Sequence, residues 1–368
     1  MTLSRRRLIG TSLALGLAFT NLAASSRPPR KEHPADAAAP RHADRPGGYA
    51  HRADVRDWAA AQTRPGGALE DWKTQTVLAA LAPARYQRKA AQLILPAPAG
   101  VAKNWVLYRD RFIEPRRLQA GLRFWEAHAA ALQRAQTQFG VPASLVMGIL
   151  GVETFFGQIQ GNFRVLDALA TLAFDFPRGR SDRSSYFSEE LAAFLQLARA
   201  ESRAPTAFKG SFAGAMGLGQ FMPSSWRRYA LDFDGDGHID LAGNPTDAIG
   251  SIANFLREHG WTPGQPTHWA ANEPSDKGLR DRLLAPDIEP RWTALDVTQF
   301  AATESARASL DTHGPWALVR LENGSDAPAS YVLGSRNFWV VTRYNRSAYY
   351  ALAVIELGEE LARLREAQ

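Results

Sequence analysis

The sequence predicts a mainly helical α+β protein with one small β-containing domain towards its C-terminus. Apolar residues recur at helical spacing in several segments before residue 262. After residue 262 the chain becomes Pro-rich, and short runs then alternate apolar and polar residues as strands do. With 368 residues, 45% of them hydrophobic, the chain is long enough for two or three domains and a large core.

The predicted elements follow this change of pattern. Helical spacing covers residues 55–81 with a break at 65–67, and it is continuous over 117–139. Further helices are predicted at 167–172, 186–201 and 246–258. Residues 262–310 are predicted to be irregular. Short strands are predicted at 316–320, 329–333 and 337–342, and from residue 348 the chain returns to helix.

The N-terminus has the pattern of an export signal. Three consecutive arginines at 5–7 precede an apolar run over 8–18, and small residues follow at 23–25, which is typical of the twin-arginine type. A membrane-spanning anchor is the alternative, but it needs about 20 apolar residues, and this run is shorter and interrupted. We therefore predict cleavage and a soluble periplasmic protein.

Charge and cysteine content exclude several functions. The chain has no cysteine, so it has no disulfide, thiolate metal site, cysteine nucleophile or cysteine-linked lipid. Residues 1–52 contain 9 of the 43 basic and 3 of the 37 acidic residues, which leaves 34 of each in the rest. The net charge of +6 is thus confined to the N-terminal segment. We expect neither nucleic-acid binding nor a stable membrane anchor.

A lone carboxylate lies in a strongly apolar helical segment. Val146 and Leu150 form a row at i and i+4 that Glu153 and Gly157 continue. No other ionisable residue occurs between residues 134 and 164, so burial would raise the pKa of Glu153, as a general acid requires. The alternative is that Glu153 is solvated at the edge of the row or forms an ion pair with a distant arginine.

A Gly-rich stretch over 209–225 has four glycines within ten positions. Glycine lets a backbone lie against a ligand, and the polar Ser211 and Gln220 with the aromatic Phe221 suit a sugar. A plain turn is the alternative. The stretch lacks the Lys-Ser/Thr ending of a phosphate-binding loop, so nucleotide binding is not predicted.

Residues 232–240 have the spacing of a calcium loop. Oxygen ligands occupy positions 1, 3, 5 and 9, a glycine occupies position 6, and position 7 supplies a carbonyl. Position 12 is glycine instead of the expected glutamate, so the closing ligand must come from elsewhere, and Asp247 is the nearest carboxylate. A solvated Asp/Gly turn is the alternative. We predict a structural Ca²⁺ and no organic cofactor, with the ligands Asp232, Asp234, Asp236, His238, Asp240 and Asp247.

Taken together, these stretches resemble the lytic murein transglycosylase B family. The matching pieces are the Gly-Val-Glu-Thr motif at Glu153, the Leu-Asp-Ala-Leu-Ala-Thr-Leu segment at 166–172, the Gly-Ala-Met-Gly loop at 214–217, the calcium loop and Thr-Arg-Tyr-Asn at 342–345. They stand in the family's order and span about residues 108–351.

This resemblance implies a lysozyme-like helical core, flanked by an α-domain and a small β-domain, that acts on peptidoglycan. It implies Glu153 as the single catalytic acid/base. The residues implied to line the glycan site are Tyr108, Ser211, Gln220, Phe221, Asn345 and Tyr350. Arg178 matches the first of a pair of arginines, but Gly179 takes the second place, and Arg180 and Arg183 follow in an insertion. Contacts to peptide stems are therefore left open.

The resulting division of the chain is an export signal over 1–25, a disordered tether over 26–48, an α-domain over 49–136, a catalytic core with the calcium loop over 137–261, a small β-containing domain over 262–342, and a C-terminal helix over 343–368 that returns to the core and the α-domain.

The predicted reaction cleaves the bond between N-acetylmuramic acid and N-acetylglucosamine without water, which leaves a 1,6-anhydro end. One alternative is a hydrolytic muramidase, which needs a second carboxylate such as Asp167 or Asp175 brought to Glu153 by folding. The other is a non-catalytic peptidoglycan-binding protein. The sequence identifies no protein partner.

Overall fold

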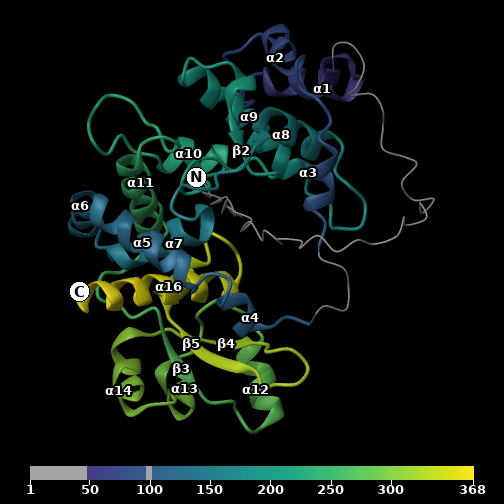
Figure 1. The fold of residues 1–368 in the computed structure, drawn as a ribbon. Coiled ribbons are helices and arrows are strands. Elements are labelled where there is room, and N and C mark those ends of the chain that lie inside the picture. The colour runs from purple at the N-terminus through teal and green to yellow at the C-terminus, as the bar shows by residue number, and fades with distance from the viewer. Residues whose placement is uncertain (1–47, 97–101) are drawn as a thin grey trace, which may run out of the picture.

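The computed structural model describes residues 48–96 and 102–368, and these are mainly helical (Figure 1). The predicted export signal and nearly all of the predicted tether lie outside the described residues. Within the described part, no single helix is long and apolar enough to cross a membrane. One sharply bent pair, Ala129–Phe139 with Ala143–Thr154, meets the length and composition test only jointly.

An N-terminal group of helices packs on two helices from the middle of the chain (Figure 1, upper part). Tyr49 and Arg52 donate hydrogen bonds to opposite oxygens of Asp175, each at 2.7 Å, and so attach the first turn of the described chain to this group. The elements are η2 (Gly48–His51), α1 (Ala53–Gln62), α2 (Thr74–Leu81), α3 (Arg88–Leu93), α8 (Val165–Phe174) and α9 (Ser184–Ala200). The helices predicted at 167–172 and 186–201 are confirmed with slightly longer bounds.

The predicted single helix over 117–139 is wrong. Two helices occupy the segment, α5 (Pro115–Ala127) and α6 (Ala129–Phe139), with His128 between them at φ −121° and ψ 20°. Helix α5 packs on α7 (Ala143–Thr154) and α16 (Ala348–Glu366), whereas α6 packs mainly on α11 (Pro245–Glu258). Because both helices bury apolar faces in the same core, the apolar spacing continues through the break and conceals it.

The small β-containing domain holds a three-stranded antiparallel sheet in the order β3–β5–β4. Its own apolar core includes Trp316, Leu318 and Leu333. The elements are β3 (His268–Ala271), α12 (Lys277–Leu284), α13 (Ala294–Val297), η4 (Thr298–Phe300), α14 (Glu304–His313), β4 (Ala317–Leu321) and β5 (Ser330–Gly334). Residues 262–310, predicted to be irregular, therefore contain one strand and several short helices.

The strand predicted at 337–342 is also wrong, because this segment forms helix α15 (Arg336–Val341). The Ser335 hydroxyl accepts hydrogen bonds from the backbone N–H groups of Asn337, at 3.0 Å, and Phe338, at 3.5 Å, and so caps the helix. Phe338, Val340 and Val341 are all buried. A run that is apolar on several sides fits a buried short helix as well as a strand.

Two antiparallel helices, α7 (Ala143–Thr154) and α16 (Ala348–Glu366), form the centre of the molecule (Figure 1). Glycines allow their close approach. A Cβ atom at Gly148 would lie 2.0 Å from the Val354 carbonyl oxygen, and one at Gly358 would lie 2.1 Å from that of Ser144. No larger residue fits at either position without moving a backbone. This packing brings the start of α16 to the end of α7.

The remaining elements surround this pair. They are α4 (Trp105–Arg109), β1 (Phe163–Arg164), η3 (Pro205–Ala207), β2 (Lys209–Gly210) and α10 (Pro223–Tyr229). Strands β1 and β2 pair antiparallel, and this pairing anchors the beginning of the Gly-rich stretch.

Candidate active site

Glu153 lies in the last turn of α7, and only 2% of its surface is exposed. The Tyr350 hydroxyl, at the start of α16, donates a hydrogen bond of 2.6 Å to its Oε1 atom. The Oε2 atom is inaccessible and has no hydrogen-bond partner among the described residues. A buried carboxylate oxygen without a partner is rare. Protonation removes the negative charge and leaves an O–H group that can donate to a ligand.

Burial raises the pKa of Glu153 from 4.5 to about 7, and the hydrogen bond from Tyr350 opposes this only in part. Among the described residues Glu153 forms no ion pair. The two alternatives for this residue, a solvated edge and a distant arginine partner, do not describe the structure. A substantial fraction of the carboxyl is therefore protonated at neutral pH.

The backbone turns sharply after α7. Phe155 and Phe156 have φ angles of 53° and 57°, in the left-handed region that non-glycine residues rarely adopt. Helix α7 ends at Thr154, so Gly157 does not continue the helical row as predicted. The Thr154 hydroxyl donates to the Leu218 carbonyl at 2.8 Å and accepts from the Gly157 N–H at 2.9 Å. This side chain ties the end of α7 to the Gly-rich stretch.

Tyrosines surround the Glu153 carboxyl. Tyr344 is stacked parallel to Tyr350 at 6.5 Å between ring centroids, and its hydroxyl donates to the Gly219 carbonyl at 2.5 Å. Burial, with a smaller contribution from the nearby Glu153 charge, raises the pKa of Tyr108 to about 12. The sequence prediction omitted Tyr344, although this residue belongs to the Thr-Arg-Tyr-Asn motif that contributed Asn345.

The Gly-rich stretch contains a hydrogen-bonded turn at Ser211 and a side-chain amide, that of Gln220, whose oxygen has no partner among the described residues. The buried Ser211 hydroxyl oxygen accepts from the N–H groups of Ala213 and Ala215 at 3.3 and 3.0 Å. Gln220 has a φ angle of 52°, and its amide nitrogen donates to the carbonyls of Gln160 and Gly217 at 3.1 and 2.9 Å. Its Oε1 atom is buried without a partner among the described residues. Gln220 is thus the member of this stretch prepared to meet a ligand.

Of the other residues predicted to line the site, Phe221 lies differently from expectation. Phe221 is 3% exposed and packs edge-on against Tyr344 and Phe255, so it has no free face for a sugar. Asn345 is half-buried in the turn that precedes α16. Phe221 therefore supports the tyrosines from behind.

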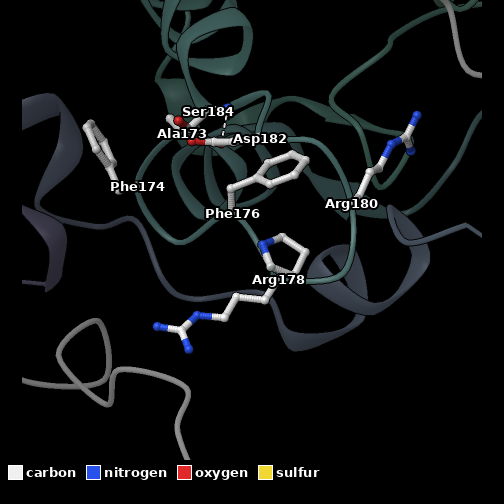
Figure 2. A pocket seen from close by; sticks show the side chains of 8 residues that line it. Ala173, Phe174, Phe176, Arg178, Arg180, Asp182 and Ser184 are labelled. Atoms are coloured by element: carbon white, nitrogen blue, oxygen red, sulfur yellow. Dashed lines mark hydrogen bonds between the residues drawn. The ribbon is translucent and has the colours of Figure 1, made fainter.

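Arg178 lies at a cavity of about 370 Å³ next to the N-terminal helices (Figure 2). Its side chain is exposed, and it extends away from that of Arg180. Arg180 donates to the Ile94 carbonyl at 2.6 Å, and the Arg183 guanidinium lies 4.6 Å from the Tyr186 ring centroid. Both arginines of the insertion are thus engaged with other parts of the protein.

The calcium loop brings carboxylates together. One oxygen from each of Asp232, Asp234 and Asp247 lies within 4.8 Å of the other two. The oxygens of the fully buried Asp247 accept from the N–H groups of Phe233 and Asp240, each at 2.8 Å, so this residue connects the two ends of the loop. Hard oxygen donors of this kind fit Ca²⁺.

The other predicted calcium ligands lie outside this group of three. The Asp236 carboxylate accepts from the His238 N–H, and that of Asp240 accepts from Ala242 and Gly243. The His238 ring nitrogen Nδ1 lies 3.6 Å from a Glu201 carboxylate oxygen. This does not bear on the calcium prediction, in which His238 contributes its backbone carbonyl and not its ring.

The carboxylates considered for a hydrolytic mechanism are already occupied. Asp175 accepts from Tyr49 and Arg52, and Asp167 accepts from Arg164 at 2.7 Å and from the Arg85 N–H at 2.9 Å. Both residues serve the packing of the N-terminal helices. Neither provides a second catalytic carboxylate for Glu153.

A buried carboxyl with a raised pKa and one unpartnered oxygen, set beside tyrosines and a Gly-rich stretch, suits an enzyme that cleaves glycans by acid/base chemistry. The comparisons with known proteins agree with this class. Residues 54–359 match the family described as the transglycosylase SLT domain. The chain belongs to this family.

Its relatives are lytic transglycosylases. The chain is 44% identical over 269 residues to the membrane-bound lytic murein transglycosylase B of Escherichia coli K12. The aligned residues cover 73% of this chain and 70% of that protein. The soluble lytic transglycosylase SltB1 of Pseudomonas aeruginosa is 38% identical with a TM-score of 0.72, covering 85% of this chain and 99% of that one. Slt35 of Escherichia coli, solved in complex with calcium, is 36% identical with a TM-score of 0.71, covering 87% and 96%.

These matches confirm the predicted family, the lysozyme-like fold class and the enzyme class. The protein is a peptidoglycan lytic transglycosylase. The hydrolytic and non-catalytic alternatives are not favoured.

Proposed function

We propose that Glu153 is the only acid/base of the reaction. Its protonated carboxyl donates a proton to the glycosidic oxygen, and the bond from that oxygen to C1 of N-acetylmuramic acid breaks. The muramyl N-acetyl carbonyl supports the positive C1. The Glu153 carboxylate then accepts the proton of the sugar's 6-hydroxyl, whose oxygen bonds to C1. The acid is regenerated, and the product is a 1,6-anhydro sugar.

The free Oε2 atom of Glu153 is the observation that carries this proposal. Tyr350 occupies Oε1, so Oε2 is the oxygen that holds and transfers the proton. A pKa of about 7 suits a group that acts first as an acid and then as a base near neutral pH. In this proposal Tyr108, Gln220, Asn345 and Tyr350 contact the glycan, Ser211 and Phe221 shape the site, and Arg178 meets a peptide stem.

Digestion of purified peptidoglycan tests this function. Products are separated and their masses measured. Muropeptides with anhydro ends, each lighter by one water than the corresponding reducing end, are expected. Reducing ends would show a hydrolase, and undigested material would show a binding protein; either result would overturn the proposal.

We also propose that the cluster of Asp232, Asp234 and Asp247 binds a structural Ca²⁺. The converging carboxylates support this, as does the calcium complex of the related Slt35. If Ca²⁺ binds only the native state, a free Ca²⁺ concentration of 100 times the dissociation constant raises the free energy of unfolding by about 2.7 kcal/mol. Addition of calcium is therefore expected to raise the melting temperature of the chelator-treated protein.

The matched variants are Asp234→Ala in the cluster and Asp326→Ala on an exposed loop of the β-containing domain. Asp234→Ala should remove the calcium-dependent rise in melting temperature, and Asp326→Ala should keep it. A wild-type melting curve that is the same with calcium and with chelator would show that the loop is only a turn.

A periplasmic location for the processed protein is a further proposal, supported by the export-signal pattern over residues 1–25. Cell fractionation checks it, because recovery in membranes after a high-salt wash would contradict release.

A further inference from the structure

Tyr108, next to Glu153, belongs to a segment attached to the β-containing domain. The Trp105 N–H donates to the Glu322 carbonyl at 2.7 Å, and the Gly324 N–H donates to the Lys103 carbonyl at 2.9 Å. The Asn104 side-chain amide donates to the Asn323 carbonyl at 3.0 Å. We call these paired segments, residues 103–105 and 322–324, the clasp. It joins the start of α4 to the end of β4.

Helix α4 depends on such an attachment. It has five residues, and a helix this short is not stable by itself in water. Trp105 is buried, but Val106 and Leu107 are 49% and 62% exposed, so α4 buries apolar surface on one side only. Asn104 also accepts from the Leu107 N–H at 3.0 Å, so one side chain both caps α4 and bonds to the β-containing domain.

Tyr349 connects the clasp to the active site. Its hydroxyl accepts from the Glu322 N–H at 2.6 Å, while its ring lies edge-on to Trp105 and Tyr108 at 6.1 and 5.9 Å. The next residue, Tyr350, donates to Glu153. The ends of three segments that are distant in the sequence thus meet around Tyr108.

We propose that the β-containing domain positions Tyr108 at the glycan site through the clasp, with Asn104 and Tyr349 as positioning residues. This rests on the proposed function of Glu153 and of Tyr108. Helix α4 has other contacts, the Arg109–Glu356 ion pair and the packing of Trp105. We expect that the ion pair and the packing of Trp105 do not by themselves hold the Tyr108 side chain in the position that contacts the glycan.

A double-mutant cycle tests the proposal on a soluble glycan-strand substrate. Tyr349→Phe keeps the ring and removes the hydrogen bonds of its hydroxyl with the Glu322 backbone. It is expected to raise KM roughly three- to tenfold with kcat nearly unchanged. In a Tyr108→Ala background the same change should have no further effect, because its influence passes through Tyr108. Asn104→Ser, which keeps a capping oxygen and lacks the amide, should behave like Tyr349→Phe.

The matched control is Tyr331→Phe, which removes a hydroxyl bonded to Glu273 within the β-containing domain and outside the clasp. It should leave KM unchanged. Equal KM effects of Tyr349→Phe with and without Tyr108, or no effect of either clasp variant, would overturn the proposal. Glu153→Gln, assayed in parallel, judges the proposed function separately, because an inactive Glu153→Gln with silent clasp variants rejects only the clasp.

Discussion

Replacing Glu153 by glutamine is expected to lower the rate of glycan cleavage by at least about 100-fold, the lower end for a general acid. Glutamine has nearly the same shape, and its amide oxygen accepts the hydrogen bond from Tyr350 as Oε1 does. It has no proton to donate at neutral pH. Release of soluble muropeptides from purified peptidoglycan measures the effect, and circular dichroism checks the fold.

Glu190→Gln is the matched control for this experiment. Glu190 is the other glutamate among the described residues that is almost fully buried, and its carboxylate accepts from the hydroxyl and the N–H of Ser224. It has no place in the proposed chemistry, so its replacement should leave the cleavage rate near that of the wild type. A folded Glu153→Gln protein with wild-type turnover would reject Glu153 as the acid.

The Glu153→Gln substitution is also expected to change how the free energy of unfolding depends on pH. The pKa of Glu153 is about 7 in the folded protein and 4.5 without burial. Between these values the folded state keeps the proton and the unfolded state loses it, so the free energy of unfolding falls as pH rises through the window from 4.5 to 7. The loss is on the order of 3 kcal/mol.

Glutamine does not titrate, so Glu153→Gln should lack this loss. Its free energy of unfolding relative to the wild type should therefore increase by this amount between pH 4.5 and pH 8. Urea unfolding at several pH values measures the difference. If the difference between the two proteins does not change with pH, the pKa of Glu153 is not raised, and the physical basis of its role as an acid is lost.

Local patterns predicted most of the longer helices and singled out Glu153 as a carboxylate in an apolar segment. Apolar spacing located α8, α9 and α11, since each buries one face against the same core. Apolar spacing did not reveal the break between helices at His128 or the helical conformation of α15. In the first case two helices share one apolar row, and in the second a short buried helix has no polar face to reveal its period. Both errors arise because burial by neighbours overrides the local pattern.

The sequence by itself determined which groups are present: one carboxylate in a long uncharged segment, glycines where helices and loops need close approach, and aspartates at calcium-loop spacing. Only the tertiary structure decided what these groups meet. Tyr350 contacts Glu153 from 197 positions away, made possible by Gly148 and Gly358 between α7 and α16. Tyr108 reaches them through a clasp on another domain. The raised pKa and the free oxygen result from this packing, because desolvation and hydrogen bonding depend on neighbours in space.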